Sequence, residues 1–410
     1  MKLTKIAALA TVAVLTVTAC STTPSGGGTD KGTIEIWSSL PRQGSSKAQT
    51  DTIVNAIKLA LEEAGNKAGG YTIVYKDVDD STAAAGKWDE ATEIKNANDA
   101  VANDKLMVYI GTFNSGAAKL SIPILCAKGI VMISPANTYP GLTKAGKGVE
   151  GEPGKYYPNG CARNYTRTVP ADDFQGLAGA VWAKKLGLTS AYVLDDTELY
   201  GKGIADVFND EAPGQGITVL GRDGIDGKAT DYKALAEKIK ATNPQLVYYG
   251  GITQNNAGQL WRDLRDAMPD VKLMGPDGIF EGEFLQAAGE AAEGTYITFG
   301  GIPPDKLTGK GAAFFAAYNA KYPDAPPEAY TAYGYEAAKV ALAAIERAAA
   351  TNPADMTGLR AAILKEVLAT KDFAGVLGTW SFNAEGDTSL TEMSGLIVTG
   401  GAFVFSEIIK

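Results

Sequence analysis

Short apolar runs alternate with longer amphipathic segments along most of this chain. The run Leu106–Ile110 stops at Gly111, and the run Ile130–Ser134 stops at Pro135. Runs of this kind are typical of buried parallel strands that end in loops. In an open α/β sheet, ligands bind at the loops on the carboxyl edge. The pattern therefore predicts that two neighbouring loops hold a small molecule.

Strands and helices are expected to alternate between residues 33 and 134. Ile53, Ile57 and Leu61 recur at helical spacing, whereas the apolar runs on either side indicate strands. Such alternation predicts a parallel, doubly wound sheet with right-handed crossovers. The predicted elements are strands Thr33–Trp37, Tyr71–Lys76, Leu106–Ile110 and Ile130–Ser134, with helices Ser46–Ala64 and Trp88–Ala102.

A segment rich in Gly, Pro and Lys, Gly141–Gly160, interrupts this alternation and is expected to be an insertion loop. The alternation then starts again, so we expect two α/β lobes of one design. Predicted helices are Asp172–Leu186, Tyr200–Asn209, Asp231–Ala241, Asn256–Ala267, Gly311–Tyr322, Ala329–Ala350 and Leu359–Thr370. Predicted strands are Ala191–Leu194, Ile217–Leu220, Leu246–Tyr249, Lys272–Met274 and Thr295–Phe299, with a strand-like tail at Gly375–Phe405.

Length and composition agree with two lobes. A chain of 410 residues is too long for one ordinary core. Its formal net charge of -9 argues against nucleic acid as a partner. The chain has no histidine, which is the usual general base and zinc ligand, so catalysis is not expected. The acidic segment Asp77–Asp80 has no further ligands spaced to complete a metal site, and no motif indicates a cofactor.

Residues 1–20 have the pattern of an export signal. Two lysines precede the apolar run Ile6–Ala19, which is too short to span a bilayer comfortably. The end of this segment resembles the lipobox of a bacterial lipoprotein signal, in which Cys20 is lipidated and begins the mature chain. An ordinary secretory signal or an uncleaved anchor is the alternative. The Gly-rich residues 21–32 are expected to form a flexible tether with a reach of roughly 20 Å. The body is therefore expected to be extracytoplasmic and lipid-anchored to the cell membrane.

With Cys20 reserved for lipid, Cys126 and Cys161 remain. Outside the cytoplasm, two such thiols usually pair. A disulfide would fix the insertion loop to the first lobe, and by closing roughly 35 residues it would stabilise the fold by about 3–4 kcal/mol. The alternative is two buried free thiols.

Five short motifs, in this order and at this spacing, carry a family likeness. They are Ile110–Gly111 with Ser115, Gly129–Thr138, Tyr200–Gly201, Val247–Gly251 and Met274–Gly278. Through them the chain resembles the substrate-binding proteins of branched-chain amino-acid ABC transporters. These have the type I periplasmic binding fold, which includes the Leu/Ile/Val-binding protein. The likeness covers nearly everything after the tether.

This resemblance implies two doubly wound lobes joined by a three-strand hinge, with a ligand in the cleft over which they close. It also implies ABC permease subunits as partners. The chain is expected to cross between the lobes near Val169, Phe299 and Gly375. Lobe 1 then comprises residues 33–169 plus 299–375, and lobe 2 comprises residues 170–298 plus 376–410.

An amino-acid zwitterion needs hydrogen-bond donors at its carboxylate and acceptors at its ammonium, with water excluded. Ser115 follows a predicted strand and opens a predicted helix, so its hydroxyl, its amide and the positive helix end suit a carboxylate. The carbonyl of Ala136 suits an ammonium, and the hydroxyl of Thr138 suits either end. Each also has a plain structural explanation, because serine is a common helix N-cap and Pro-Ala-Asn-Thr is good turn chemistry.

Two residues are expected to close over the ligand from the second lobe. Asp277 follows a predicted strand and would pair with the ammonium, although Pro-Asp-Gly is also a common turn. The family more often carries Glu here, so the shorter Asp would bring the lobe closer or act through water. Tyr200 matches a cleft tyrosine of the family, and packing beneath the loop is its alternative role.

Five further residues are expected to decide which side chain binds. Trp37, Gln43, Phe113 and Asn114 are predicted to line the side-chain end of the cleft, where they mix polar and apolar character. Ile252 stands where the family pattern has an aromatic residue. Gln43 and Asn114 suit a polar side chain or an amide as well as a leucine, so the sequence leaves the ligand open.

The leading interpretation is a tethered solute-binding lipoprotein that captures an amino acid, or a related zwitterion or amide, for an ABC permease. The alternative is a sensor that presents the bound ligand to a signalling partner. A secreted hydrolase on this fold would need two facing carboxylates roughly 5–10 Å apart, and the sequence offers Asp277 alone.

Overall fold

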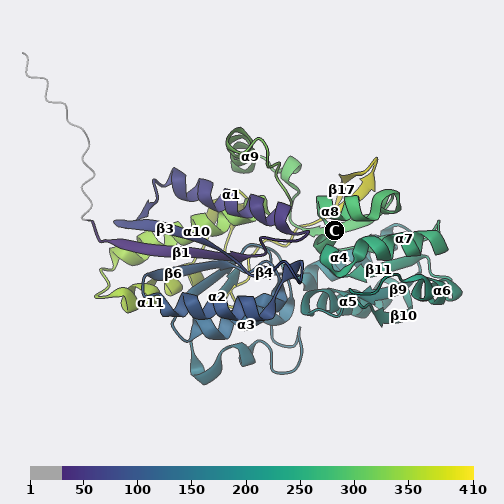
Figure 1. Ribbon diagram of the computed structural model, residues 1–410, viewed down its shortest axis with the longest axis horizontal. Coiled ribbons are helices and arrows are strands. Elements are labelled where there is room, and N and C mark those ends of the chain that lie inside the picture. Colours follow the sequence, from purple (N-terminus) through teal and green to yellow (C-terminus); the bar gives the residue numbers. More distant parts are fainter. Residues whose placement is uncertain (1–29) are drawn as a thin grey trace, which may run out of the picture.

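The computed structural model describes residues 30–410. The predicted signal segment, Cys20 and nearly all of the predicted tether lie outside the described residues. Two α/β lobes lie side by side along the longest axis of the molecule, each around its own sheet (Figure 1). None of the helices in the described part is both long enough and apolar enough to cross a membrane.

The first lobe is built on a six-stranded sheet in the order β2-β3-β1-β6-β7-β8. Strand β2 pairs antiparallel with β3, and the other pairs are parallel. Strands β6 and β7 are buried along their whole length, as their uninterrupted apolar runs predict. The strands are β1 (Thr33–Leu40), β2 (Lys67–Ala68), β3 (Tyr71–Asp79), β6 (Leu106–Gly111), β7 (Val131–Ser134) and β8 (Tyr165–Arg167).

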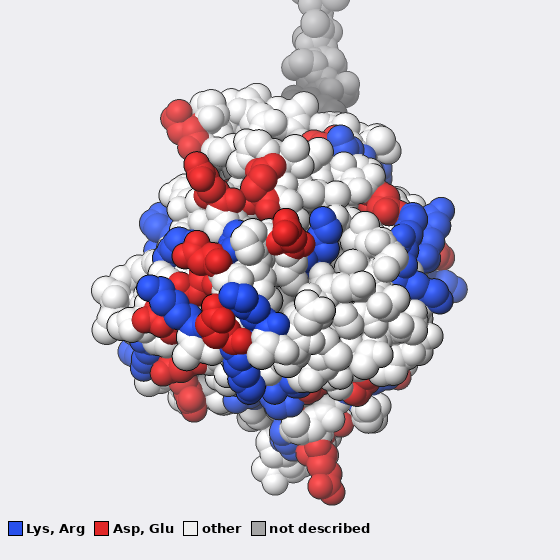
Figure 2. Space-filling view, turned by 90° about the vertical axis from the view of Figure 1, so that its right-hand side faces the viewer, with Lys and Arg blue, Asp and Glu red and all other residues white. Residues whose placement is uncertain are grey.

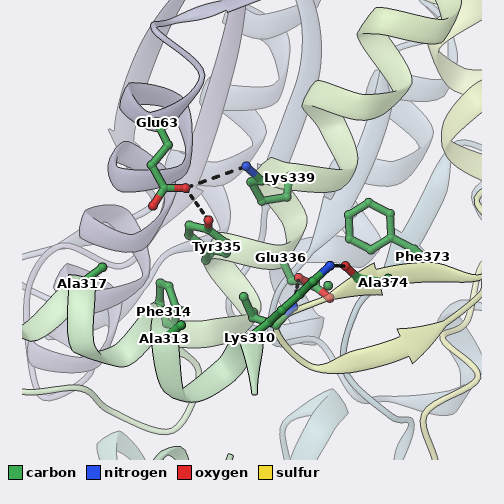
Figure 3. A pocket seen from close by; sticks show the side chains of 12 residues that line it. Glu63, Lys310, Ala313, Phe314, Ala317, Tyr335, Glu336, Lys339, Phe373 and Ala374 are labelled. Atoms are coloured by element: carbon green, nitrogen blue, oxygen red, sulfur yellow. Dashed lines mark hydrogen bonds and ion pairs between the residues drawn. The ribbon is translucent and has the colours of Figure 1, made fainter. Parts of the chain in front are cut away.

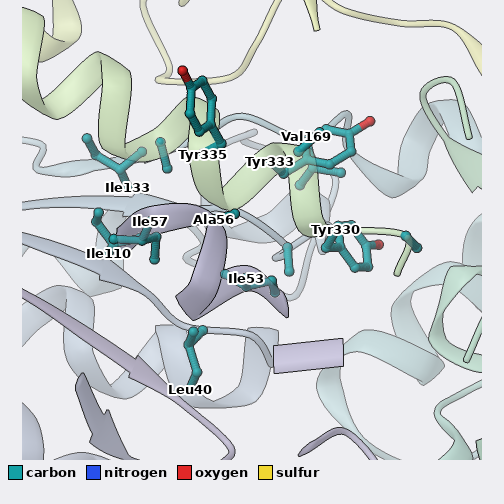
Figure 4. Close-up of a cluster of buried hydrophobic side chains, with 14 of the residues drawn as sticks. Leu40, Ile53, Ala56, Ile57, Ile110, Ile133, Val169, Tyr330, Tyr333 and Tyr335 are labelled. Atoms are coloured by element: carbon teal, nitrogen blue, oxygen red, sulfur yellow. The ribbon is translucent and has the colours of Figure 1, made fainter. Parts of the chain in front are cut away.

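Helices cover both faces of this sheet (Figure 1). Helix α1 packs against α10 on one face, and α2 packs beside α3 on the other. The core under α1 and α10 joins Ile53 and Ile57 of the predicted stripe to Ile110 and Ile133 of the sheet (Figure 4). The helices are α1 (Lys47–Glu63), α2 (Glu90–Ala102), α3 (Ser115–Cys126), α9 (Lys310–Lys321), α10 (Thr331–Ala350) and α11 (Met356–Leu368).

The second lobe is built on a seven-stranded sheet in the order β10-β9-β11-β12-β13-β16-β17. The pairs from β10 to β13 are parallel, whereas β16 and β17 join antiparallel. Alternate residues of β11 serve two cores, with Leu246 and Tyr248 in one and Val247 and Tyr249 in the other. The strands are β9 (Ser190–Asp195), β10 (Thr218–Gly224), β11 (Leu246–Gly250), β12 (Lys272–Gly275), β13 (Tyr296–Gly300), β16 (Met393–Thr399) and β17 (Ala402–Ile409).

Five helices cover this second sheet. Helix α4 packs on α5, and α7 packs on both α6 and α8. The face of the molecule on the right of Figure 1 is turned to the viewer in Figure 2, where Lys and Arg side chains lie among Asp and Glu side chains. The helices are α4 (Asp172–Lys185), α5 (Leu199–Glu211), α6 (Lys233–Ala241), α7 (Ala257–Ala267) and α8 (Gly282–Ala288).

Short elements complete the described part. The sequence pattern does not predict them, because pieces of two to four residues show no period. They are hairpin strands β4 (Ser81–Thr82), β5 (Lys87–Trp88), β14 (Phe373–Gly375) and β15 (Gly378–Trp380), and 3-10 helices η1 (Pro140–Leu142), η2 (Gly154–Tyr156), η3 (Pro158–Gly160), η4 (Pro213–Gln215), η5 (Thr253–Asn255), η6 (Asp277–Ile279), η7 (Gly289–Ala292) and η8 (Pro304–Lys306).

A disulfide ties the insertion after β7 to the first lobe. It joins Cys126, at the end of α3, to Cys161, with 5.9 Å between the Cα atoms. Inside the insertion, the hydroxyl groups of Tyr139 and Tyr156 both donate to the carboxylate of Glu152. The disulfide and these hydrogen bonds hold the Gly-rich segment in one conformation against the first lobe.

The chain passes between the lobes three times. It leaves β8 for the second lobe at residues 168–171, and it returns after β13, which ends at Gly300. Strand β16 begins the final segment of the second sheet at Met393.

The third passage lies later than the expected position near Gly375. Trp380 donates to the buried carboxylate of Glu336 on α10 at 2.7 Å, and Asp387 pairs with Arg167 of β8 at 2.7 Å. These contacts hold residues 376–387 against the first lobe. The boundary predicted at 375 is therefore too early, and we propose that the second lobe resumes at β16.

Candidate ligand-binding site between the lobes

Residues from both lobes line a small cavity where the strands end. Its volume is about 30 Å³, far below the roughly 300–1,000 Å³ of small-molecule sites. An amino acid can therefore enter only when the lobes stand further apart than in this structure. The lining residues are Phe113, Asn114, Ser115, Ala136 and Tyr330 from the first lobe, and Tyr200, Ile252, Asp277 and Gly278 from the second.

The first-lobe wall contains the N-terminus of α3. The helix begins at Ser115, directly after the N-cap residue Asn114. The Ser115 hydroxyl accepts a hydrogen bond from the backbone N–H of Tyr139 at 3.4 Å, so its own O–H remains available to donate. Because a helix N-terminus carries positive potential and free N–H groups, this wall suits an anionic group.

The loop after β7 forms the next part of this wall. The Ser134 hydroxyl accepts from the backbone N–H of Ala136 at 3.2 Å and from that of Asn137 at 2.8 Å, which fixes the turn. The hydroxyl of Thr138 is buried and has no hydrogen-bond partner of normal geometry within residues 30–410. Thr138 is not among the residues that line the cavity, and its hydroxyl lies beside the buried carboxylate of Asp172.

Asp277 is the second-lobe carboxylate at the cavity. Its Oδ1 accepts from the Gln175 side chain at 2.6 Å and from the Tyr200 hydroxyl at 2.9 Å, and its Oδ2 accepts from the Tyr330 hydroxyl of the first lobe. A carboxylate has about four acceptor positions, so one remains for a ligand ammonium. Burial raises the pKa of Asp277, although these hydrogen bonds oppose the shift.

Asp172, the first residue of α4, is a second buried carboxylate that the sequence analysis missed. Neither oxygen accepts a hydrogen bond of normal geometry within the described residues, although the Thr138 hydroxyl lies beside it. Burial and the nearby charge of Asp277 raise its pKa well above the ordinary value. Two buried carboxylates close together favour a cation between them. Because an Asp at a helix start is common in any protein, its position in the sequence does not indicate a binding role.

The remaining walls are largely apolar. Phe113 meets Tyr330 edge-on, with 5.8 Å between ring centroids. Ile252 is buried, and its backbone N–H donates to Asp196 at 3.1 Å. Gly278 lies so close to the Tyr200 ring that a Cβ would approach within 2.7 Å of it, which explains the glycine.

Trp37 and Gln43 do not line the cavity, so their predicted role is not supported. Trp37 packs in the core under α2 and α3, because strand alternation turns it away from the face that carries Ile36. The Gln43 amide donates to Asp79 at 2.7 Å, which holds it against the end of β3. Asn114 does line the cavity, and its buried Oδ1 has no hydrogen-bond partner in the described part.

Polar contacts join the lobes around the cavity. Lys87 of the β4–β5 hairpin forms an ion pair with Glu198, and the Trp88 indole donates to the same carboxylate at 3.1 Å. Elsewhere along the interface, Gln49 of α1 donates to Glu281 at 3.1 Å. The lobes are therefore closed on each other in this structure.

Comparison with known proteins identifies the family. Residues 33–399 match the family model for periplasmic binding proteins. The chain belongs to the periplasmic binding protein family. One relative is the Leu/Ile/Val-binding protein homolog 2 of Brucella abortus, which is 31% identical over 375 residues that cover 89% of this chain and 90% of the relative. The Leu/Ile/Val-binding protein BraC3 of Rhizobium johnstonii is 29% identical over 358 residues, covering 86% and 88%.

Solved structures agree with this assignment. The leucine-binding protein LivK of Thermotoga maritima superposes with a TM-score of 0.79 at 25% identity, covering 92% of this chain and 99% of that one. LivJ of Streptococcus pneumoniae, solved with isoleucine, gives 0.77 at 24% identity, covering 92% and 99%. The predicted family of branched-chain amino-acid ABC transporter binding proteins and the predicted type I fold are both confirmed. These relatives are solute-binding proteins rather than enzymes, and periplasmic binding proteins work outside the cytoplasm.

Proposed function

We propose that this periplasmic binding protein captures an α-amino acid between its lobes and delivers it to an ABC permease. The observation that carries the proposal is the opposed chemistry of the two cavity walls. The first lobe presents Ser115 and the N-terminus of α3 to the cavity, whereas the second lobe presents the buried carboxylate of Asp277, and the carboxylate of Asp172 is buried nearby. Such a site suits a small molecule that carries an anionic and a cationic end.

In this proposal the ligand carboxylate lies at the N-terminus of α3, where it accepts from the Ser115 hydroxyl and amide. Its ammonium lies towards Asp277, with the Thr138 hydroxyl and the Ala136 carbonyl as further acceptors. Because Asp277 comes from the second lobe and the others from the first, only the closed protein completes the ammonium site.

The side-chain end favours an aliphatic group. Phe113, Ile252 and the Ala136 methyl offer apolar surface, and Asn114 adds a polar side chain. This agrees with relatives named for leucine, isoleucine and valine, and with a protein of Pseudomonas aeruginosa, 28% identical, that is named for leucine, isoleucine, valine, threonine and alanine. We therefore expect a branched or small aliphatic amino acid.

The lipid anchor is a separate part of the proposal. It rests on residues 1–20, whose charged start, apolar run and final Cys20 fit a lipoprotein signal. A tether over residues 21–32 would keep the binding body near the membrane that holds the permease. Radiolabelled palmitate should be incorporated into the wild type and not into the Cys20→Ala variant.

A thermal-shift panel of the twenty amino acids and their amides tests the binding function. A ligand at 100 times its dissociation constant adds roughly 2.7 kcal/mol to the free energy of unfolding. We expect the largest shift with an aliphatic amino acid and a smaller shift with its amide. A panel in which no amino acid stabilises the protein would refute the proposal.

Amino-acid binding should release protons at mildly acidic pH. Burial raises the pKa of Asp172 and Asp277 above the ordinary 3.8, and a bound ammonium favours their ionised form. Affinity should therefore rise with pH from about 4 upward. The stability of the free protein depends on pH in the opposite direction. Above about pH 4, the native state holds more protons than the unfolded state. The stability contribution of these groups then falls as pH rises through their raised pKa values.

Calorimetry at pH 5 in two buffers of different ionisation enthalpy measures this release. The wild type should give heats that depend on the buffer, and the Asp172→Asn variant should show a smaller difference. Equal heats in both buffers for the wild type would mean that these carboxyl groups do not lose protons on binding.

A further inference from the structure

A second cavity, of about 360 Å³, lies on the first lobe away from the cleft (Figure 3). Helices α9 and α10, the end of α1 and strand β14 enclose it. Its volume falls in the range of small-molecule sites, and none of its lining residues borders the cleft cavity. It is therefore a candidate site in its own right.

The walls of this cavity are aromatic and aliphatic. Phe314 of α9 lies against Tyr335 of α10, with 4.5 Å between ring centroids, and Phe373 of β14 stands on the other side of the space (Figure 3). The small side chains of Ala313 and Ala317 leave room between them. Such a lining suits a flat or branched apolar body.

The two carboxylates of the cavity already have partners. Glu336 accepts from the Trp380 indole at 2.7 Å and from the backbone N–H of Val376 at 3.0 Å. Glu63 accepts from the Tyr335 hydroxyl. Burial also raises the pKa of Glu336, which reduces the negative charge at the cavity floor. A cationic ligand would therefore compete with hydrogen bonds that already exist.

The two ammonium groups, in contrast, have donors to spare. Lys339 forms an ion pair with Glu63 at 3.8 Å (Figure 3), which is beyond hydrogen-bond distance, and lies 5.6 Å from the centre of the Tyr335 ring, so it makes no hydrogen bond within the described residues. Lys310 donates to the Ala374 carbonyl at 2.5 Å, which leaves two of its three N–H groups. Both ammonium groups lie at the rim of the aromatic space (Figure 3).

We propose that this cavity binds a small carboxylate with an apolar or aromatic body, whose carboxylate faces Lys339 and Lys310 and whose body lies between Phe314 and Phe373. The acceptor atoms of such a ligand meet the unused donors, while its body covers the rings. Helix α9 follows the second passage between the lobes and β14 precedes the third, so a bound molecule would connect the two segments.

Calorimetric titration of the full chain with 3-phenylpropanoate tests this proposal. The wild type should bind, and 3-phenylpropanol, which has no charge, should bind at least fivefold more weakly. Lys339→Gln should weaken 3-phenylpropanoate at least fivefold, and Ala317→Trp, which fills the space from an exposed position on α9, should abolish binding. Lys128→Gln makes the same charge change at an exposed position outside the cavity and should leave binding unchanged.

The Asp277→Ala variant distinguishes binding of the probe in this cavity from binding in the cleft. If 3-phenylpropanoate occupies the α9 cavity, the variant binds it as the wild type does, whatever happens to amino-acid binding. Loss of binding in Asp277→Ala together with full binding in Lys339→Gln would place the probe in the cleft and overturn the proposal. Failure of the wild type to bind at about 10 mM would overturn it as well.

Discussion

Replacing Asp277 with alanine should weaken amino-acid binding at least 100-fold. The carboxylate is buried, and in our account it provides the second-lobe acceptor for the ligand ammonium. Truncating one member of a buried charge pair costs about 2–5 kcal/mol, and a 100-fold loss corresponds to about 2.7 kcal/mol. The substitution also removes the hydrogen bond with Tyr330 that joins the lobes at the cavity. Titration calorimetry with the amino acid found in the thermal-shift panel measures the loss.

Two variants control this experiment. Asp277→Asn keeps an acceptor for the hydroxyl groups but loses the charge, so its affinity should fall between those of the wild type and the alanine variant. Asp266→Ala removes the same group from an exposed position on α7 and should bind as the wild type does. An affinity of Asp277→Ala within threefold of the wild type would mean that another group holds the ammonium.

Replacing Arg167 with methionine should lower the free energy of unfolding by about 3–5 kcal/mol. Arg167 is fully buried and pairs with Asp387 at 2.7 Å. It also donates to the Tyr139 carbonyl at 2.8 Å and to the Thr143 hydroxyl. The substitution therefore leaves the buried carboxylate of Asp387 with only the more distant Lys144, at 3.8 Å, as a cationic partner, and it frees the loop that carries Thr138. Urea denaturation followed by circular dichroism measures the change.

The double variant Arg167→Met/Asp387→Asn shows whether the stranded charge causes this loss. It should regain part of the lost stability, because a neutral amide is cheaper to bury than an unpaired carboxylate. Lys95→Met breaks a pair between exposed residues, Lys95 and Asp99, and should change stability by less than about 1 kcal/mol. An Arg167→Met variant as stable as Lys95→Met would show that the buried pair contributes little.

Local patterns in the sequence were enough to predict the strand ends that form the first-lobe wall. Parallel strands covered on both faces need uninterrupted apolar runs, which β6 and β7 have, and the loops that follow such strands meet at one edge. Ser115 and Ala136 follow these strands. The structure places both at one cavity with Tyr200 and Asp277, and their roles in binding remain a proposal.

Other features depend on contacts between distant parts of the chain. Tyr330 reaches Asp277 only because α10 returns to the first lobe after the second passage, and Asp172 matters because folding buries it near Asp277. Trp37 turned out to face the core because the side it takes depends on strand register. The third passage lies later than its predicted position because a distant partner, Arg167, holds Asp387 on the first lobe.

Titration of the amino acid against its two single-charge analogues tests the central claim most directly. For a leucine ligand these are 4-methylpentanoate, which lacks the ammonium, and 3-methylbutylamine, which lacks the carboxylate. Each analogue leaves the buried polar groups of one wall unpaired. The account therefore predicts at least 100-fold weaker binding for both. If 4-methylpentanoate bound as tightly as the amino acid, the second-lobe carboxylates would not hold an ammonium, and the proposed division of the site between the lobes would be contradicted.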